Sequence, residues 1–110
     1  MKIKPCIIGL GYVGLPLFVR LQKKFQTVGF DVNKKRVENL RNGQDTNGEY
    51  EKKELKILNS SIYSSNVDDI KKCNFFIIAV PTPIYKSKKP NLSFLIHATN
   101  LVAKYIKKND

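Results

Sequence analysis

The chain has 110 residues, 42% of them apolar, a length that allows one buried core but not several domains. Its formal net charge of +11 is compatible with a polyanionic partner such as a nucleic acid or a membrane surface. The lysines, however, are spread along the chain in pairs without interleaved aromatic residues, which favours a solvated surface over nucleic-acid binding.

The first expected elements are a strand at about Lys4 to Leu10 and a helix from Tyr12 to Phe25, joined by a Gly-x-Gly-x-x-Gly turn. Gly9 can adopt the positive φ of a tight turn, and Gly11 has no Cβ to keep a diphosphate off the backbone. Gly14 lets the helix lie close to its strand. We therefore expect this turn to bind the diphosphate of a dinucleotide.

The expected diphosphate ligands are the backbone amides of Tyr12 to Leu15, because a helix N-terminus offers unpaired N–H groups and a partial positive charge. Tyr12 could also flank the cofactor, or it could simply cover the edge of the sheet. Pro16 removes an N–H and would crowd the carbonyl of Tyr12 in a regular helix. The helix is therefore expected to begin irregularly.

The start of the chain superficially resembles a signal peptide, since a short basic segment precedes an apolar run. Three glycines interrupt that run, and no small-x-small cleavage site follows it. The chain has no uninterrupted apolar stretch long enough to span a membrane. We expect a cytoplasmic protein without a membrane partner.

A second short strand, Thr27 to Val32, contains Asp31, which lies 20 residues after Gly11. At this spacing a carboxylate can accept hydrogen bonds from both hydroxyls of the adenosine ribose. The same carboxylate would repel a 2′-phosphate, so NAD is favoured over NADP. The basic residues of the next turn, Lys34, Lys35 and Arg36, could neutralise such a phosphate, or they could be solvated.

The rest of the chain continues to alternate between helical and strand patterns, which predicts a parallel sheet wound with helices on both faces. The predicted fold is thus α/β, the N-terminal part of a Rossmann-like doubly wound sheet with about four strands. The remaining expected elements are a helix at 34–42, a polar loop at 43–48, a lysine-rich helix near 50–58, a weak strand at 61–65, a short helix at 67–72, a strand at 74–80 and a helix at about 92–108.

The strand at 74–80 has no polar face, which is typical of a central strand covered on both sides. It stops at Pro81-Thr82-Pro83, on the edge of the sheet where the glycine turn and Asp31 are expected. Thr82 could contact the cofactor there, or it could be a turn residue held by two prolines. His97 lies off the apolar stripe of the last helix, so we expect a surface residue without a catalytic role.

The two cysteines, Cys6 and Cys73, lie far apart and lack any Cys-x-x-Cys or Cys/His spacing. This pattern predicts neither a metal site nor a disulfide framework. Buried free thiols in a reducing compartment are expected.

Three ordered motifs resemble the nucleotide-sugar 6-dehydrogenase family, which includes UDP-glucose and GDP-mannose dehydrogenases. They are the segment from Ile7 to Leu17, then Gly29-Phe30-Asp31, and then Ala79-Val80-Pro81-Thr82-Pro83. Pro16 also recurs in that family, which accounts for its unusual position. Asn42-Gly43-Gln44-Asp45 with Glu51, and Lys89-Pro90-Asn91-Leu92-Ser93, look more like the UDP-N-acetylglucosamine and UDP-N-acetylgalactosamine branch than the UDP-glucose branch.

The resemblance implies the NAD-binding portion of an enzyme that oxidises the C6 alcohol of a nucleotide sugar to a uronic acid, with two NAD reduced, in surface polysaccharide biosynthesis. The intact enzyme is then expected to be a homodimer. The cofactor-binding residues implied are Gly9, Gly11, Tyr12, Val13 and Gly14 for the diphosphate, Asp31 for the adenosine ribose, Arg36 for the adenosine end, and Thr82 near the fourth strand.

In the family that the chain resembles, the catalytic thiol and lysine lie in a later region, and neither Cys6 nor Cys73 matches the setting of that thiol. Residues 1–110 are therefore interpreted as part of an NAD-binding domain, with the catalytic and substrate domains elsewhere, and as inactive alone. An alternative is a stand-alone nucleotide-binding or regulatory module without catalysis. Nucleic-acid binding is a third hypothesis.

Overall fold

The computed structural model describes residues 2–110. It contains short strands and helices that alternate along the chain, as predicted. In chain order the elements are β1 (Pro5–Ile8), α1 (Gly14–Leu21), β2 (Val28–Phe30), α2 (Lys34–Arg41), β3 (Ile62–Ser64), α3 (Val67–Ile70), β4 (Phe75–Ile78) and α4 (Ser93–Tyr105).

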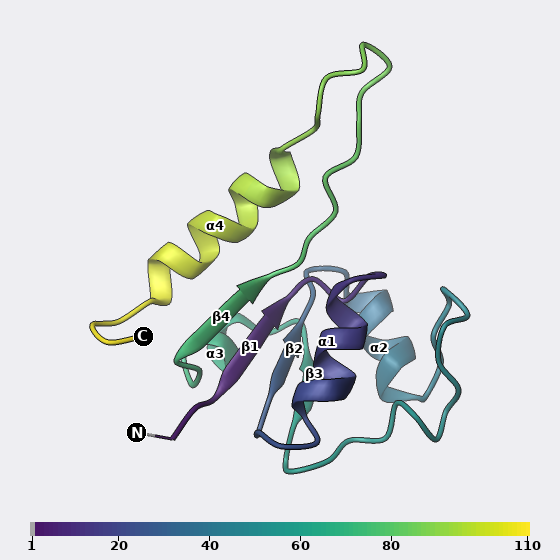
Figure 1. The fold of residues 1–110 in the computed structure, drawn as a ribbon, viewed down its shortest axis with the longest axis vertical. Coiled ribbons are helices and arrows are strands. Elements are labelled where there is room, and N and C mark those ends of the chain that lie inside the picture. Colours follow the sequence, from purple (N-terminus) through teal and green to yellow (C-terminus); the bar gives the residue numbers. More distant parts are fainter. Residues whose placement is uncertain (1) are drawn as a thin grey trace.

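The four strands form one parallel sheet in the order β3-β2-β1-β4. In this register Ile7 of β1 lies between Gly29 of β2 and Ile77 of β4. The chain moves outward from β1 to β2 and β3, and then returns to the other side of β1 for β4 (Figure 1). This is the predicted Rossmann-like, doubly wound arrangement, and it makes β1 an inner strand.

Alternate residues of β1 contribute to two separate cores, because successive side chains of a strand point to opposite faces of the sheet. Ile7 belongs to a core with α1 and α2, in which the rings of Phe18 and Tyr63 lie 4.6 Å apart. Cys6 and Ile8 belong to the opposite core, which α3 and α4 cover. Cys6 and Cys73 are both buried and free, as predicted.

The predicted helix near 50–58 is wrong. Residues 52–55 make a single turn, in which the Leu55 amide donates to the carbonyls of Glu51 and Lys52. The buried side chain of Gln22 then donates to the Lys56 carbonyl and accepts from the Leu58 amide. A contact across more than 30 positions therefore uses the backbone groups that a longer helix would need.

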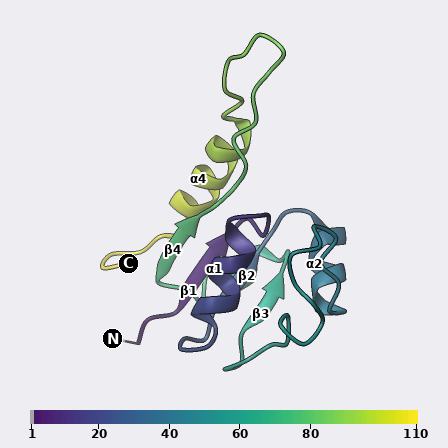
Figure 2. The ribbon, with the colours of Figure 1, turned by 45° about the vertical axis from the view of Figure 1, so that its right-hand side comes forward.

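The prediction that β4 is a central strand is also wrong for the described residues, although its side chains pack against the cores on both faces of the sheet. It is an outer strand of the sheet in residues 2–110, so three of its residues are only partly buried and Phe75 is 51% exposed. After β4 the chain runs through an exposed arm, closed by an isolated bridge between Ile84 and Pro90, before α4 begins. Figures 1 and 2 both show this arm projecting away from the sheet.

Within residues 2–110, no helix has the length and apolar character needed to cross a membrane.

Candidate functional site

A cavity of about 1110 Å³ lies at the carboxyl ends of β1, β2 and β4. The chain leaves β1 toward α1 on one face of the sheet and leaves β4 toward α4 on the other, so a crevice opens between the two connections. The residues that line it are Ile8 to Val13, Phe30 to Asn33, Lys35, Arg36, Asn39, Thr46, Asn47, Ala79 to Pro81, Ser93, Phe94, His97, Ala98 and Leu101.

The three glycines of the turn differ in what surrounds them. Gly9 has φ +102°, and a Cβ built there would lie 2.8 Å from the Ala79 carbonyl oxygen. A Cβ on Gly14 would lie 1.6 Å from the Gly9 carbonyl oxygen, so this glycine allows α1 to start against the turn. A Cβ on Gly11 would have no neighbour within 4 Å, and Gly11 lines the cavity. Only the middle glycine therefore leaves space for a ligand.

Free backbone N–H groups lie at the start of α1, and two of the residues that carry them, Tyr12 and Val13, line the cavity. The amides of Tyr12, Val13 and Gly14 donate to no described residue, whereas the Leu15 amide donates to the Gly11 carbonyl at 3.1 Å. The Leu15 amide, which was expected to bind the diphosphate, is therefore already paired within the chain. Pro16 is the third residue of α1, where a helical amide has no partner within the helix, and this resolves its apparent conflict with a helix.

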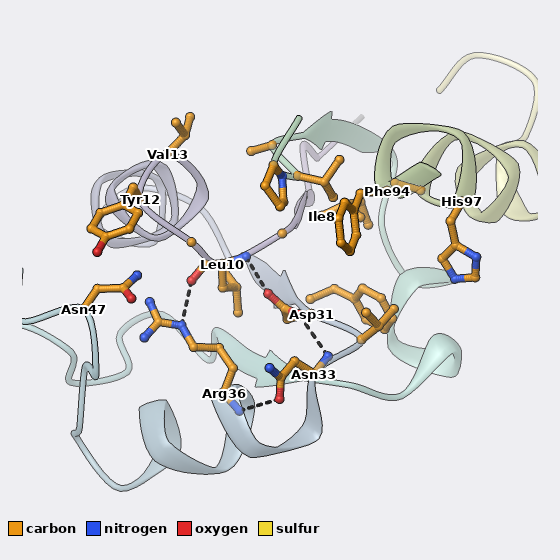
Figure 3. A pocket seen from close by; sticks show the side chains of 18 of the residues that line it. Ile8, Leu10, Tyr12, Val13, Asp31, Asn33, Arg36, Asn47, Phe94 and His97 are labelled. Atoms are coloured by element: carbon orange, nitrogen blue, oxygen red, sulfur yellow. Dashed lines mark hydrogen bonds between the residues drawn. The ribbon is translucent and has the colours of Figure 1, made fainter. Parts of the chain in front are cut away.

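Asp31 follows β2, and its carboxylate connects the glycine turn to the start of α2. One carboxylate oxygen accepts the Leu10 amide at 2.9 Å, and the other accepts the Asn33 amide at 2.9 Å (Figure 3). The residue is half-buried and lines the cavity. Because each carboxylate oxygen can accept more than one hydrogen bond, Asp31 retains acceptor capacity toward a ligand.

Arg36 is not a solvated residue of the first helical turn, although Lys34 and Lys35 are exposed. Its Nε donates to the Leu10 carbonyl at 2.8 Å, and its Nη1 pairs with Asp45 at 2.8 Å. The whole residue is 9% exposed. Among the described residues its Nη2 is buried without any hydrogen-bond partner, and other atoms of Arg36 line the cavity.

Two of the predicted site residues do not line the cavity. Gly14 is buried behind the turn, and Thr82 is exposed in the segment that leads to the arm. The neighbouring Pro81 does line the cavity. The structure therefore brings six of the eight predicted residues to one cavity: Gly9, Gly11, Tyr12, Val13, Asp31 and Arg36.

Sequence reasoning missed lining residues on two elements. Phe94, His97 and Leu101 share one face of α4, and their helical spacing of three and four positions could have revealed them. Asn47 comes from the connection between α2 and β3, and no sequence signal marks it. His97 is exposed, as expected of a surface residue, but it also lies at one end of the cavity (Figure 3).

A parallel doubly wound sheet with this turn at its switch point, and a carboxylate at the end of the neighbouring strand, defines a dinucleotide-binding α/β domain. Residues 1–110 match the family described as the UDP-glucose/GDP-mannose dehydrogenase family, NAD binding domain. The chain belongs to this family, and its cofactor is NAD.

Relatives of known activity agree with this assignment. A UDP-N-acetyl-D-glucosamine 6-dehydrogenase of Salmonella typhi is 49% identical over 109 residues, which cover 99% of this chain and 26% of the relative. A Pseudomonas aeruginosa protein of the same name is 44% identical over 108 residues, with 98% and 26% covered. The chain thus spans about a quarter of the length of these relatives.

Solved structures show the same fold. A UDP-D-ManNAc dehydrogenase from Pyrococcus horikoshii superposes with a TM-score of 0.83 at 28% identity, covering 97% of this chain and 27% of that one. A ternary complex of GDP-mannose dehydrogenase from Pseudomonas aeruginosa has a TM-score of 0.82 at 19% identity, covering 94% of this chain and 25% of the other. At that low identity the second likeness concerns the fold alone.

Proposed function

We propose that this chain is the cofactor-binding part of an NAD-dependent nucleotide-sugar 6-dehydrogenase, with a UDP-N-acetylhexosamine or UDP-glucose as substrate. The 49% identity to a UDP-N-acetyl-D-glucosamine 6-dehydrogenase supports the first substrate class. The observation that carries the proposal is that the open Gly11, Tyr12 and Val13 with their free amides, and Asp31 all line one cavity.

In this proposal the diphosphate lies against Gly9, Gly11 and the free amides of Tyr12, Val13 and Gly14. The hydroxyls of the adenosine ribose donate to the Asp31 carboxylate, and Arg36 contacts the adenosine end. These residues fit the group, because an unpaired helix N-terminus suits a diphosphate and a carboxylate suits two hydroxyls. Thr82 retains a proposed cofactor contact, which would need the segment after β4 to approach the ligand.

When bound, NAD accepts a hydride from the substrate carbon. Two such transfers, from the C6 alcohol and then from the aldehyde level, would give the uronic acid and reduce two NAD. The second oxidation needs a nucleophilic thiol to trap the aldehyde. Cys6 and Cys73 are the only cysteines, both are buried, and neither lines the cavity. We therefore assign the chemistry to the parts of the family's longer chains that residues 1–110 do not match.

We also propose that the intact enzyme is a homodimer, acts in the cytoplasm and contributes to surface polysaccharide biosynthesis. The family likeness supports these proposals, and sedimentation of the intact enzyme tests the first.

The alternative of a nucleotide-binding module without catalysis is favoured by one observation, the burial of both thiols. It predicts NAD binding by a product that has no further catalytic region.

The experiment that tests the cofactor site is titration of the 110-residue chain with NADH, followed by ligand fluorescence. Gly11→Val should nearly abolish binding, because its side chain would occupy the space beside the free amides. Asp31→Ala should weaken binding, because the ribose loses its acceptor. Ala103→Val, an exposed site on α4 away from the cavity, is the matched control and should bind like the wild type. Full affinity in both site variants would refute the proposal.

A further inference from the structure

The connection between α2 and β3 is held by one carboxylate, Asp45, whose side chain is fully buried. One of its oxygens accepts from Arg36 Nη1 at 2.8 Å and from the Asn47 amide at 3.0 Å. The other accepts from the amides of Glu49 and Tyr50 at 2.9 and 3.1 Å. Asp45 therefore fixes both the fold of its own segment and one arm of the Arg36 guanidinium.

The charge of Asp45 is maintained by these contacts. Burial alone would raise the pKa of the Asp45 carboxyl. The hydrogen bond from Arg36, the amides of Asn47 and Glu49, and the charge of Arg36 outweigh burial and hold that pKa below its ordinary value. A carboxylate is thus present opposite Arg36 at neutral pH.

The guanidinium of Arg36 is fixed at several points. Its Nε donates to the Leu10 carbonyl at 2.8 Å, and its Nη1 donates to Asp45 and, at 3.4 Å, to the Thr46 hydroxyl. Because the guanidinium is planar and rigid, these contacts also determine the direction of Nη2. That nitrogen belongs to a side chain more than nine-tenths buried, and it has no partner among residues 2–110.

Arg36 lines the cavity, and its guanidinium lies beside Asn47 and Leu10, with Asp31 bound to the same Leu10 (Figure 3). Since Leu10 ties both side chains to the glycine turn, a ribose bound at Asp31 would lie near Arg36.

We propose that Asp45 is a positioning residue of the cofactor site. It holds the Arg36 guanidinium against the Leu10 carbonyl and so fixes the residue whose amide donates to Asp31, and it does so without touching the cofactor. This inference rests on the proposed NAD site. It extends that site to a segment between α2 and β3 that carries none of the residues predicted to bind the cofactor.

The test is a double-mutant cycle on the 110-residue chain, with the dissociation constant of NADH as the readout and thermal unfolding recorded separately. Asp45→Asn should weaken NADH binding about tenfold, the effect expected when the charge-assisted hydrogen bond that positions Arg36 is lost. In the Arg36→Met background the same change should have no further effect, because Asp45 acts through Arg36. If Asp45 acted independently of Arg36, the fold-losses of NADH affinity in the two single variants would multiply in the double variant. That outcome would overturn the proposal.

Two further variants keep the test decisive. Asp68→Asn removes the same charge from an exposed pair with Lys71 and should leave the affinity unchanged. Arg36→Lys keeps a cation for Asp45 but has only one nitrogen, so it should lose as much affinity as Arg36→Met even if Asp45→Asn fails to fold. An Arg36→Lys chain with wild-type affinity would overturn the inference.

The two levels of proposal fail in different ways. A wild-type chain that does not bind NADH would remove the proposed function itself. A wild-type chain that binds NADH while Asp45→Asn binds equally well would remove only the role of Asp45.

Discussion

Gly11 and Gly14 lie three residues apart in one turn, yet a methyl group would have opposite consequences at the two positions. Gly11→Ala meets open space and should change the free energy of unfolding by less than about 0.5 kcal/mol. Gly14→Ala would place its Cβ 1.6 Å from the Gly9 carbonyl oxygen, and we expect it to lose about 3 kcal/mol. Urea denaturation of the two variants measures both values. Equal stability would show that α1 can shift away from the turn.

Single residues also show where sequence reasoning reaches its limit. Asp31 could be predicted because its distance from Gly11 along the chain reflects the geometry of a strand, a helix and a second strand. For Arg36 the sequence left a ligand and a solvated residue as alternatives. Its burial depends on Asp45 nine positions later and on the Leu10 carbonyl, and neither contact follows from local pattern.

Among the helices, α2 has a side-chain cap that can be tested directly. Asn33 Oδ1 accepts from the Arg36 amide at 3.1 Å, which satisfies one of the free N–H groups at the helix start. We expect Asn33→Ala to destabilise the chain by about 1 kcal/mol, as measured by urea denaturation. Asn33→Asp retains an acceptor and should stay close to the wild type. An aspartate variant as unstable as the alanine variant would rule out the cap as the cause.

The elements themselves were largely predictable, because a strand and a helix differ in the period of their apolar residues. The exceptions have physical causes. The turn at 52–55 does not extend into a helix because Gln22, from the end of α1, binds the backbone that follows it. An apolar strand such as β4 reads as central, but its place at the side of the described sheet depends on which strands pair with it.

At the scale of the whole molecule, the site is a product of the winding of the chain. β1 is an inner strand, and the connections that follow β1 and β4 leave on opposite faces. The glycine turn, Asp31 and the end of β4 therefore meet at one edge although they are up to about 70 positions apart, as expected for ligands at a topological switch point. The same winding places α4 at one end of the cavity and the Asp45 segment at the other.

The last prediction separates cofactor binding from catalysis in this chain. With NAD and UDP-N-acetylglucosamine supplied, the purified 110-residue chain should bind NAD but form no NADH, as followed by absorbance. The reason is access: Cys6 is fully buried, Cys73 is 5% exposed and donates to backbone carbonyls in the core, and neither lines the cavity. The double variant Cys6→Ser, Cys73→Ser should therefore retain the NADH affinity of the wild type. Sustained NADH formation that this variant abolishes would show that a core thiol becomes accessible, and that these residues carry the chemistry themselves.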